Sequence, residues 1–291
     1  MHAVKEHTHG TPAFPAAAYP IDYVYDPNGL FFPHYHPELE FFLLAGGDAT
    51  MNINGIPIQM HPGDSVIISS YAIHSMKALS PCECKTIAVL CHPDFLRGRN
   101  EPDAVFCDYL KQLTDRSSTA IHLRAGQSAS YQANLLFRQM RRLFDERPKA
   151  YELLIKAKLL ELLFLTFSAS NLRELRQEID PAVSVILGSL DYIHAHLSED
   201  LTLDQLAAQA HLSPSQYGRL FKRTMEVTPV SYIIENRIVT ARRLLELGRK
   251  RISDVAIEVG FRNFSYFNRC FLRYTGVTPG EFRKRSAAGK A

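Results

Sequence analysis

One pattern of about 50 residues is written twice in the C-terminal part of the chain, within residues 203–285. Residues 217–229 and residues 267–279 carry an aromatic residue, Arg, Phe, Val, Thr and Pro at a constant offset. Upstream, the apolar positions of residues 203–212 match those of residues 252–261, with the offset one residue shorter. Because both copies must form the same structural unit, this repeat constrains the fold strongly. Only two copies exist, which argues against a solenoid.

Each copy has the start signals and the apolar spacing of two short helices joined by a tight turn. Capping-box sequences begin at Thr202 and at Ser213, and Pro214 occupies the favoured first helical position. Tyr217 and the apolar residues three and four positions later form one face of the next helix, which directs Arg219 to the opposite side. A buried helix pair that presents Arg among small polar residues predicts a helix-turn-helix, whose second helix enters the DNA major groove.

These residues resemble the paired helix-turn-helix domain of the AraC family of bacterial transcription regulators. The most specific part comprises Gly260-Phe261, residues 265–269 and residues 276–279. Glu226 departs from the family pattern, which usually has Gly there, as the second copy does; we therefore expect that helix to be less tightly terminated. The resemblance implies three partners, namely double-stranded promoter DNA, RNA polymerase and a second copy of the chain. The residues expected to contact DNA are Ser215, Gln216, Gly218, Arg219, Lys222, Arg223, Phe264, Ser265, Tyr266, Asn268, Arg269 and Arg273.

Basic residues are concentrated in the same part of the chain. From residue 182 onward there are sixteen Lys and Arg against ten Asp and Glu, a difference of +6, whereas the first 181 residues have a difference of −3. The overall formal charge of +3 conceals this asymmetry. Together with outward Arg side chains on repeated helices, the local excess favours contact with phosphates.

The cysteines and the N-terminal residues bear on the compartment. The five Cys are odd in number and scattered, at positions 82, 84, 91, 107 and 270. This distribution is typical of a reducing cytoplasm rather than of a secreted, disulfide-bonded protein. Residues 1–10 contain charges and three His but no apolar run, so we expect a disordered tail and neither a signal peptide nor a membrane helix. A cytoplasmic protein without membrane contact is therefore expected.

The N-terminal part reads as β-structure. From about Ile21 to Leu90, apolar and polar residues alternate over short runs broken by turn residues. Asn54-Gly55 stands between two such runs and is the strongest short hairpin signal. Several short strands at this spacing predict a sandwich or a barrel.

A run of closely spaced His and Glu lies within this predicted β-region. If the run is extended, His34, His36 and Glu40 share parity and project from one face, where His74 can join them from a neighbouring strand. The spacing resembles the first cupin motif, His-x-His-x3-Glu-x6-Gly. Metal-binding cupins hold a transition metal with three His and one Glu, whereas AraC-like regulators share the string without requiring a metal.

Three interpretations of these residues stay open: an effector pocket, a metal site, or ordinary structural pairing. The second cupin motif is poorly kept, because Ser69, Tyr71 and Ala78 stand where Pro, Gly and Asn would be. We therefore expect second-shell support for a metal to be missing, and no cofactor. The residues expected to bind the effector are His34, His36, Glu40, His74, Tyr35 and Phe42, and the alternative metal ligands are His34, His36, Glu40 and His74.

Helices are predicted from about Ser130 to Asn171, with a break at Arg147-Pro148. The second of them is apolar on more than one face, so we expect one side to pack on the β-domain and another on a partner chain. The alternative is a helix buried wholly within its own domain. By resemblance, family members dimerise through this region. Polar residues 171–180 predict an interdomain linker.

The predicted fold class is α+β, with an N-terminal cupin-like β-barrel (1–125), a helical dimerisation segment and linker (126–180), and an all-α double helix-turn-helix (181–291). The predicted function is sequence-specific transcription regulation, by resemblance activation, in response to a sugar or related metabolite. The DNA-binding half offers no nucleophile, paired catalytic carboxylates or phosphate loop, so we do not expect an enzyme. Two other functions stay open: a metal-dependent cupin enzyme fused to a DNA-binding module, and a regulator whose first domain only assembles partners.

Overall fold

The computed structural model describes residues 10, 11, 13–23, 31–79, 84–97, 104–115, 120–169, 179–246, 248 and 250–288. The predicted N-terminal tail up to residue 9, Cys82 and residues 171–178 of the predicted linker lie outside this set. The chain divides into two compact units, one within residues 6–180 and one within residues 181–291.

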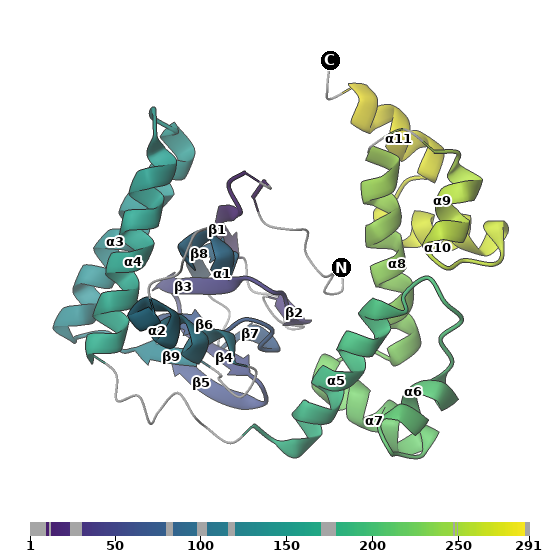
Figure 1. The fold of residues 1–291 in the computed structure, drawn as a ribbon, viewed down its shortest axis with the longest axis horizontal. Helices are drawn as coiled ribbons and strands as arrows, with labels where there is room; N and C mark the ends of the chain where they lie inside the picture. Colours follow the sequence, from purple (N-terminus) through teal and green to yellow (C-terminus); the bar gives the residue numbers. More distant parts are fainter. Residues whose placement is uncertain are drawn as a thin grey trace. The chain divides into compact units, whose positions relative to one another are not determined.

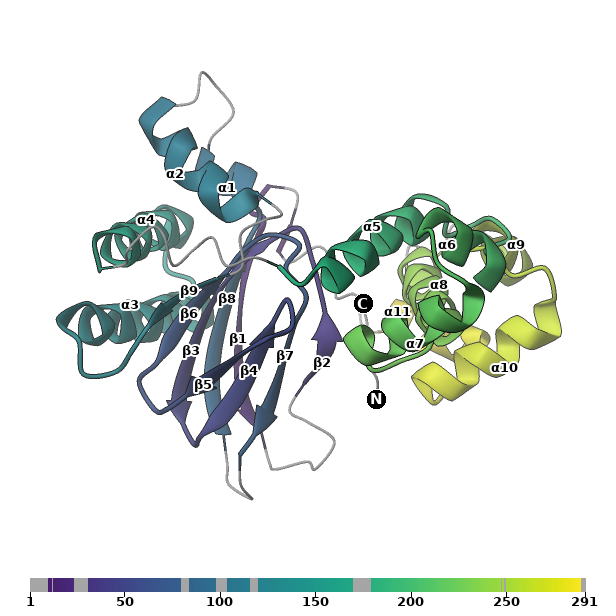
Figure 2. The same cartoon turned by 90° about the horizontal axis from the view of Figure 1, so that it is seen from below.

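Two antiparallel sheets form the first unit (Figure 1). The five-stranded sheet has the order β1 (Ala16–Tyr23), β8 (Cys84–Cys91), β3 (Leu39–Gly46), β6 (Ser65–Ile68) and β9 (Ala120–Leu123). The four-stranded sheet has the order β2 (Phe31–His34), β7 (His74–Ala78), β4 (Ala49–Ile53) and β5 (Ile56–Met60). Figure 2 shows the two sheets as facing layers. The cupin-like β-domain is thus built from two sheets packed over a shared interior.

Alternation along β3 separates two cores. Leu39, Phe41 and Leu43 contribute to a cluster that also holds buried side chains from the helices, whereas Phe42 and Leu44 contribute to a second cluster with β4, β6 and β7. Because successive side chains of a strand point to opposite faces, β3 is apolar on both sides. Each fully buried side chain of this size contributes about 1.5–3 kcal/mol of hydrophobic stabilisation.

The predicted hairpin is confirmed. Asn54 and Gly55 both have positive φ, 50° and 85°, as a two-residue turn between β4 and β5 requires. Ile53 pairs with Ile56 across it, and the Gly55 N–H donates to Asn52 Oδ1 at 2.9 Å. The turn therefore sets the register of the strand pair.

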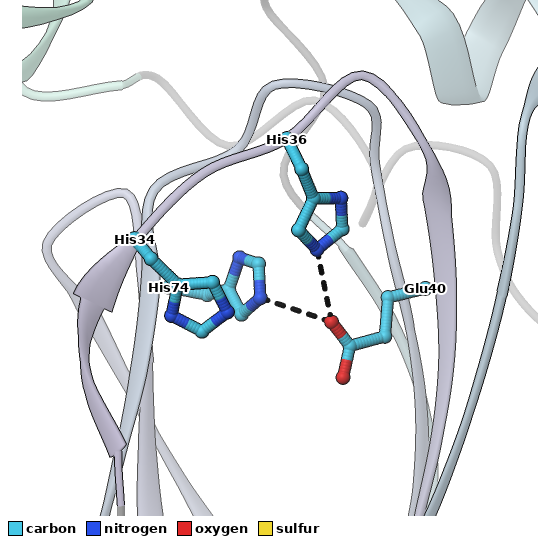
Figure 3. A group of neighbouring side chains, drawn as sticks. All are labelled: His34, His36, Glu40 and His74. Atoms are coloured by element: carbon cyan, nitrogen blue, oxygen red, sulfur yellow. Dashed lines mark hydrogen bonds and ion pairs between the residues drawn. The ribbon is translucent and has the colours of Figure 1, made fainter. Parts of the chain in front are cut away.

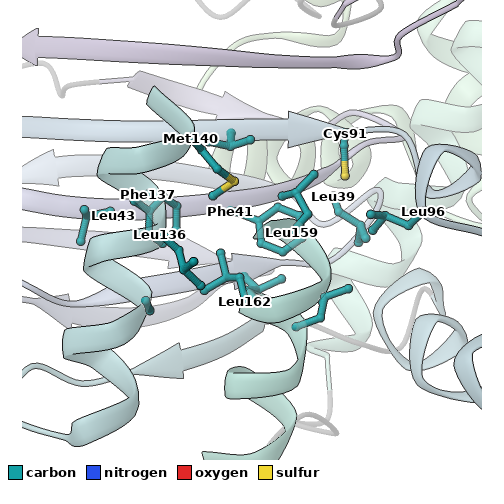
Figure 4. Close-up of a cluster of buried hydrophobic side chains, with 14 of the residues drawn as sticks. Leu39, Phe41, Leu43, Cys91, Leu96, Leu136, Phe137, Met140, Leu159 and Leu162 are labelled. Atoms are coloured by element: carbon teal, nitrogen blue, oxygen red, sulfur yellow. The ribbon is translucent and has the colours of Figure 1, made fainter. Parts of the chain in front are cut away.

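In the described part of the first unit, four helices accompany the sheets: α1 (Pro93–Arg97), α2 (Ala104–Thr114), α3 (Ser128–Glu146) and α4 (Tyr151–Ala169). The break between α3 and α4 falls where the sequence predicts it, with Arg147 in the left-handed region. Phe137 and Met140 of α3 and Leu159 and Leu162 of α4 pack on the outer face of the five-stranded sheet (Figure 4). Other apolar residues of α4 remain exposed, as described below.

The second unit is all helical: α5 (Pro181–Ala195), α6 (Leu203–Gln209), α7 (Pro214–Met225), α8 (Pro229–Glu246), α9 (Ile252–Glu258), α10 (Phe264–Thr275) and α11 (Pro279–Ala288). The capping boxes that begin at Thr202 and Ser213 are both formed. Pairs α6–α7 and α9–α10 are the two helix-turn-helix units, and α8 joins them (Figure 1). Among the described residues, no helix is both long and apolar enough to cross a membrane.

Candidate functional site

The predicted His and Glu residues converge at one end of the space between the two sheets. His34 ends β2, His36 lies in the loop that follows, Glu40 stands on β3 and His74 begins β7 (Figure 3). One ligand atom from each residue lies within 4.8 Å of the others. We call these four residues the His/Glu cluster.

The predicted reason for this convergence is wrong. The spacing of His34, His36 and Glu40 predicted that they share one face of a single extended run. Instead β2 ends at His34 and the chain crosses to the other sheet before β3 begins at Leu39. Glu40 therefore faces His34 and His74 from the other sheet, and His36 joins them from the connecting loop.

Backbone carbonyls orient two of the rings. His36 Nδ1 lies 3.2 Å from the Glu38 carbonyl oxygen, and His74 Nδ1 lies 2.9 Å from the Ala72 carbonyl oxygen. A carbonyl oxygen can only accept, so each Nδ1 carries the hydrogen. Both Nε2 atoms then face Glu40 Oε2, at 3.2 Å and 3.0 Å. The rings either donate to Glu40 as imidazolium ions or, when neutral, direct their Nε2 lone pairs into the cluster.

The charges of the cluster support one another. Burial by itself would lower the pKa of His36, but the hydrogen bond to Glu40 and the charges of Glu40 and Glu38 outweigh it and raise that pKa. Burial would raise the pKa of Glu40, yet the hydrogen bonds from His36 and His74 hold it well below its usual range. A negative Glu40 and a positively charged His36 therefore stabilise each other.

The donor set fits a divalent transition metal. Three imidazole nitrogens and one carboxylate are suitable ligands, and carbonyls that fix the Nδ1 hydrogens are the usual second-shell support of such a site. The expectation that this support is missing is wrong, because the backbone of Glu38 and Ala72 provides what the degraded second motif does not. His34, His36, Glu40 and His74 would hold the metal, which would supply a Lewis acid for an oxygen-bearing ligand.

The two remaining predicted pocket residues, Tyr35 and Phe42, lie in different surroundings. Phe42 is on the same face of β3 as Glu40 and belongs to the apolar core between the sheets. Tyr35 is buried with its ring 6.3 Å from that of Tyr71. Sequence reasoning missed Glu38, whose carboxylate lies 3.6 Å from His36 Nδ1 and is 3% exposed. The signal available in the sequence was a second acidic residue, Glu38, between His36 and Glu40.

Helix α7 exposes the side chains predicted for the first DNA-reading unit. Tyr217 and Phe221 are buried, and Ser215, Arg219, Lys222 and Arg223 are exposed. Gln216 is exposed too, but its Oε1 accepts hydrogen bonds from Ser213 N at 3.1 Å and Ser213 Oγ at 2.8 Å. Gly218, on the outward side, presents only backbone.

Helix α10 repeats this arrangement with different chemistry. Phe267, Cys270 and Phe271 are buried. The residues that face outward are Phe264, Ser265, Tyr266, Asn268, Arg269, Leu272 and Arg273. Asn263 caps the helix, its Oδ1 accepting from the Tyr266 N–H at 2.8 Å. The guanidinium carbon of Arg269 lies 5.8 Å from the centre of the Tyr266 ring, which holds the Arg side chain in place. Sequence reasoning missed Leu272, which no DNA-reading pattern singled out.

Arg237 of α8 links the segment between α5 and α6 to the second helix-turn-helix unit. Arg237 Nε donates to the Leu197 carbonyl at 2.8 Å, and its Nη2 donates to the Glu199 carbonyl at 2.5 Å. The same guanidinium lies 5.9 Å from the centre of the Phe261 ring. Arg237 therefore ties the end of α5 to the turn between α9 and α10.

Comparisons with known proteins agree with both units. A family profile described as a helix-turn-helix domain matches residues 206–285, and one described as a cupin domain matches residues 22–90. An uncharacterised HTH-type transcriptional regulator, YdeC of Bacillus subtilis, is 27% identical over 98% of this chain and 97% of its own length. The melibiose operon regulatory protein of Escherichia coli is 24% identical over 87% of this chain and 83% of its own length.

Among solved structures, fatty-acid-bound ToxT from Vibrio cholerae matches 92% of this chain and 94% of its own, with 14% identity and a TM-score of 0.45. The family assignment depends instead on the two profiles and on regulators that align along most of the chain. The repeated helix-turn-helix, apart from Glu226, and the first cupin motif agree with it. The chain belongs to the AraC family of transcription regulators, in its form with an N-terminal cupin domain and a C-terminal pair of helix-turn-helix units.

Proposed function

We propose that this regulator binds a small-molecule effector at the His/Glu cluster and promoter DNA through α7 and α10. The observation that carries the effector site is the convergence of four polar side chains at one end of an interior that is otherwise apolar. Such a cluster, at the edge of a hydrophobic core, can fix the orientation of a ligand whose other face contacts apolar side chains. Because the proposed target is promoter DNA, the proposed location is the cytoplasm.

The proposed effector is a sugar or a related polyhydroxylated metabolite, and the proposed effect is activation of transcription by contact with RNA polymerase. Hydroxyl groups both donate and accept, so they match a carboxylate that accepts and imidazoles that do either. The ring of Phe42, on the same strand face as Glu40, offers a surface for the apolar side of such a ligand. The name of the melibiose operon relative gives independent support to this class.

The test replaces one cluster residue at a time in the full-length protein. His36→Ala and His74→Ala should abolish the ligand-dependent thermal shift across a metabolite panel, together with the transcriptional response, while effector-free DNA affinity stays within about twofold of wild type. His61→Ala is the matched control, since His61 is 64% exposed and bonds Asp48 away from the cluster. A double variant that responds like wild type would place the effector elsewhere.

A metal-containing cupin is the second candidate, and the carbonyl-fixed rings favour it. In the first proposal, sensing needs no metal. Elemental analysis of untagged protein should then show well below one transition metal per chain, and chelation should leave the effector response intact. About one metal per chain, lost together with the response on chelation and restored by one specific ion, would establish the second candidate. Turnover of a substrate by that form would make the first domain an enzyme.

We further propose that the chain forms a homodimer through α4. Leu153, Leu160 and Phe164 recur at i, i+7 and i+11 on a helix whose opposite side packs on the sheet, and they are 72%, 37% and 67% exposed. An apolar stripe of this spacing fits a second copy of the same helix. Phe164→Glu should convert the dimer to a monomer in analytical ultracentrifugation, whereas Gln132→Glu at an exposed position of α3 should not. A wild-type monomer at micromolar concentration would contradict the proposal.

A further inference from the structure

The reading faces of α7 and α10 can be compared position by position, because the repeat places matching residues at a constant offset. Residues four apart on a helix form a column along its surface. One column is the same in both helices: it consists of Ser215, Arg219 and Arg223 in α7, and of Ser265, Arg269 and Arg273 in α10. The adjacent column differs: it consists of Pro214, Gly218 and Lys222 in α7, and of Phe264, Asn268 and Leu272 in α10.

The differing column of α10 leaves apolar surface in water. Phe264 and Leu272 are each 47% exposed, and Asn268 stands between them, partly buried. The Phe264 ring is stacked on Phe267, with ring centroids 6.2 Å apart and planes at 25°, so it is held in one orientation. Within the described residues, no hydrogen bond engages the Asn268 amide. The column is therefore a preformed surface with one free amide between two apolar side chains.

The surroundings of this column fit DNA as its occupant. Arg269 and Arg273 run parallel to it on the outward side and are exposed. Arg269 is further oriented by its contact with the Tyr266 ring. A strip that combines apolar groups and one amide, bordered by two positive charges, complements a groove wall whose rim carries phosphates. In α7 the corresponding strip has no such chemistry, because Gly218 lacks a side chain.

We propose that the second helix-turn-helix reads A·T base pairs through this column, and that the first does not. The Asn268 amide has the donor and acceptor to pair with adenine N6 and N7, and Phe264 and Leu272 pack against the 5-methyl groups of thymines. The first unit reads guanine through Arg219 and is indifferent to thymine methyl groups. This inference rests on the proposed placement of α7 and α10 in major grooves.

The test uses full-length protein and an operator obtained by binding-site selection. Thymines in one half of the operator are replaced by deoxyuridine, which removes only the methyl group. Replacement in the half bound by α10 should weaken binding about fourfold per contacted thymine, the loss expected for one buried methyl group. The same replacement in the half bound by α7 should change affinity by less than about 1.5-fold. Equal effects in both halves, or none in the α10 half of an operator that is bound specifically, would overturn the inference.

Substitutions assign the effect to side chains. Phe264→Ala should remove the difference between thymine and deoxyuridine operators, and Asn268→Ala should relax the preference for adenine at one position. Lys222→Ala, the matched control in α7, should weaken both operators equally. If Phe264→Ala and Leu272→Ala leave DNA affinity unchanged but lower transcription, the column contacts a protein and the inference is wrong. If no operator is selected at all, it is the proposed DNA-binding function that fails.

Discussion

The two helix-turn-helix units have the same backbone plan but are constrained differently at matching positions. The turn residue of the first unit is His211, with φ 55°, and the matching residue of the second is Gly260, with φ 94°. His211 is exposed, whereas a Cβ at Gly260 would lie 2.8 Å from the Leu197 carbonyl oxygen and 2.9 Å from Arg237. Both units need a residue with positive φ at this turn, but only in the second unit does Arg237 of α8 pack against the turn residue. The difference shows that two copies of a repeat can keep the same local backbone geometry while their matching residues make different tertiary contacts.

The largest effect is expected at this closed turn. Gly260→Ala should destabilise the protein by roughly 2–4 kcal/mol, because it adds backbone strain and displaces the Arg237 guanidinium. Gly218→Ala is the control, since a Cβ there meets nothing within 4 Å and Ala favours a helix by up to about 1 kcal/mol. Chemical denaturation of both variants measures the contrast. A Gly260→Ala variant as stable as wild type would show that the second turn is as open as the first.

The shared Arg column sets the next effect. Arg219→Ala and Arg269→Ala should each cost about 1–3 kcal/mol of binding free energy and relax specificity at one half-site only. Lys222→Ala and Arg273→Ala should weaken binding to all sequences alike, because contacts to phosphates carry no sequence information. Affinities for a series of base-substituted operators distinguish these outcomes. Unchanged specificity in both the Arg219 and the Arg269 variant would mean that the shared column contacts only the sugar-phosphate backbone of the DNA.

The smallest effect concerns the ends of the reading helices. Glu226 ends α7 with φ 59° and Gly276 ends α10 with φ 74°, where the Gly276 N–H also donates to the Leu272 carbonyl. Glu226→Gly should stabilise the protein by about 1 kcal/mol, and Gly276→Ala should destabilise it by a similar amount, because only Gly adopts the left-handed conformation without cost. Paired thermal melts measure the two shifts. Shifts of the same sign would contradict the prediction that Glu226 leaves its helix less tightly terminated.

Features with local causes were predictable from the sequence. The capping boxes, the Asn54-Gly55 turn and the break before Pro148 each depend on a few neighbouring residues, and the structure confirms them. The repeat also predicted which faces of α7 and α10 are buried, since a helix period of 3.6 fixes which residues share a face.

Features that depend on distant segments were not predictable in the same way. Parity along one strand could not show that Glu40 faces His34 and His74 from another sheet, because the crossing between sheets depends on where β2 ends. The carbonyls that orient His36 and His74 belong to the backbone, which every residue type has, so the sequence does not indicate them. Arg237 likewise contacts Leu197, which lies 40 positions away in the sequence.

Hydroxyl-radical footprinting of the full-length protein on its selected operator tests the central claim most directly, namely that two joined units read two separate half-sites. Helix α8 has 18 residues and spans about 27 Å at 1.5 Å per residue, which suits units in successive major grooves. The expected result is two protected patches about one helical turn apart on one face of the DNA, with Arg219→Ala weakening one patch and Arg269→Ala the other. A single protected patch, or loss of the same patch in both variants, would contradict the account.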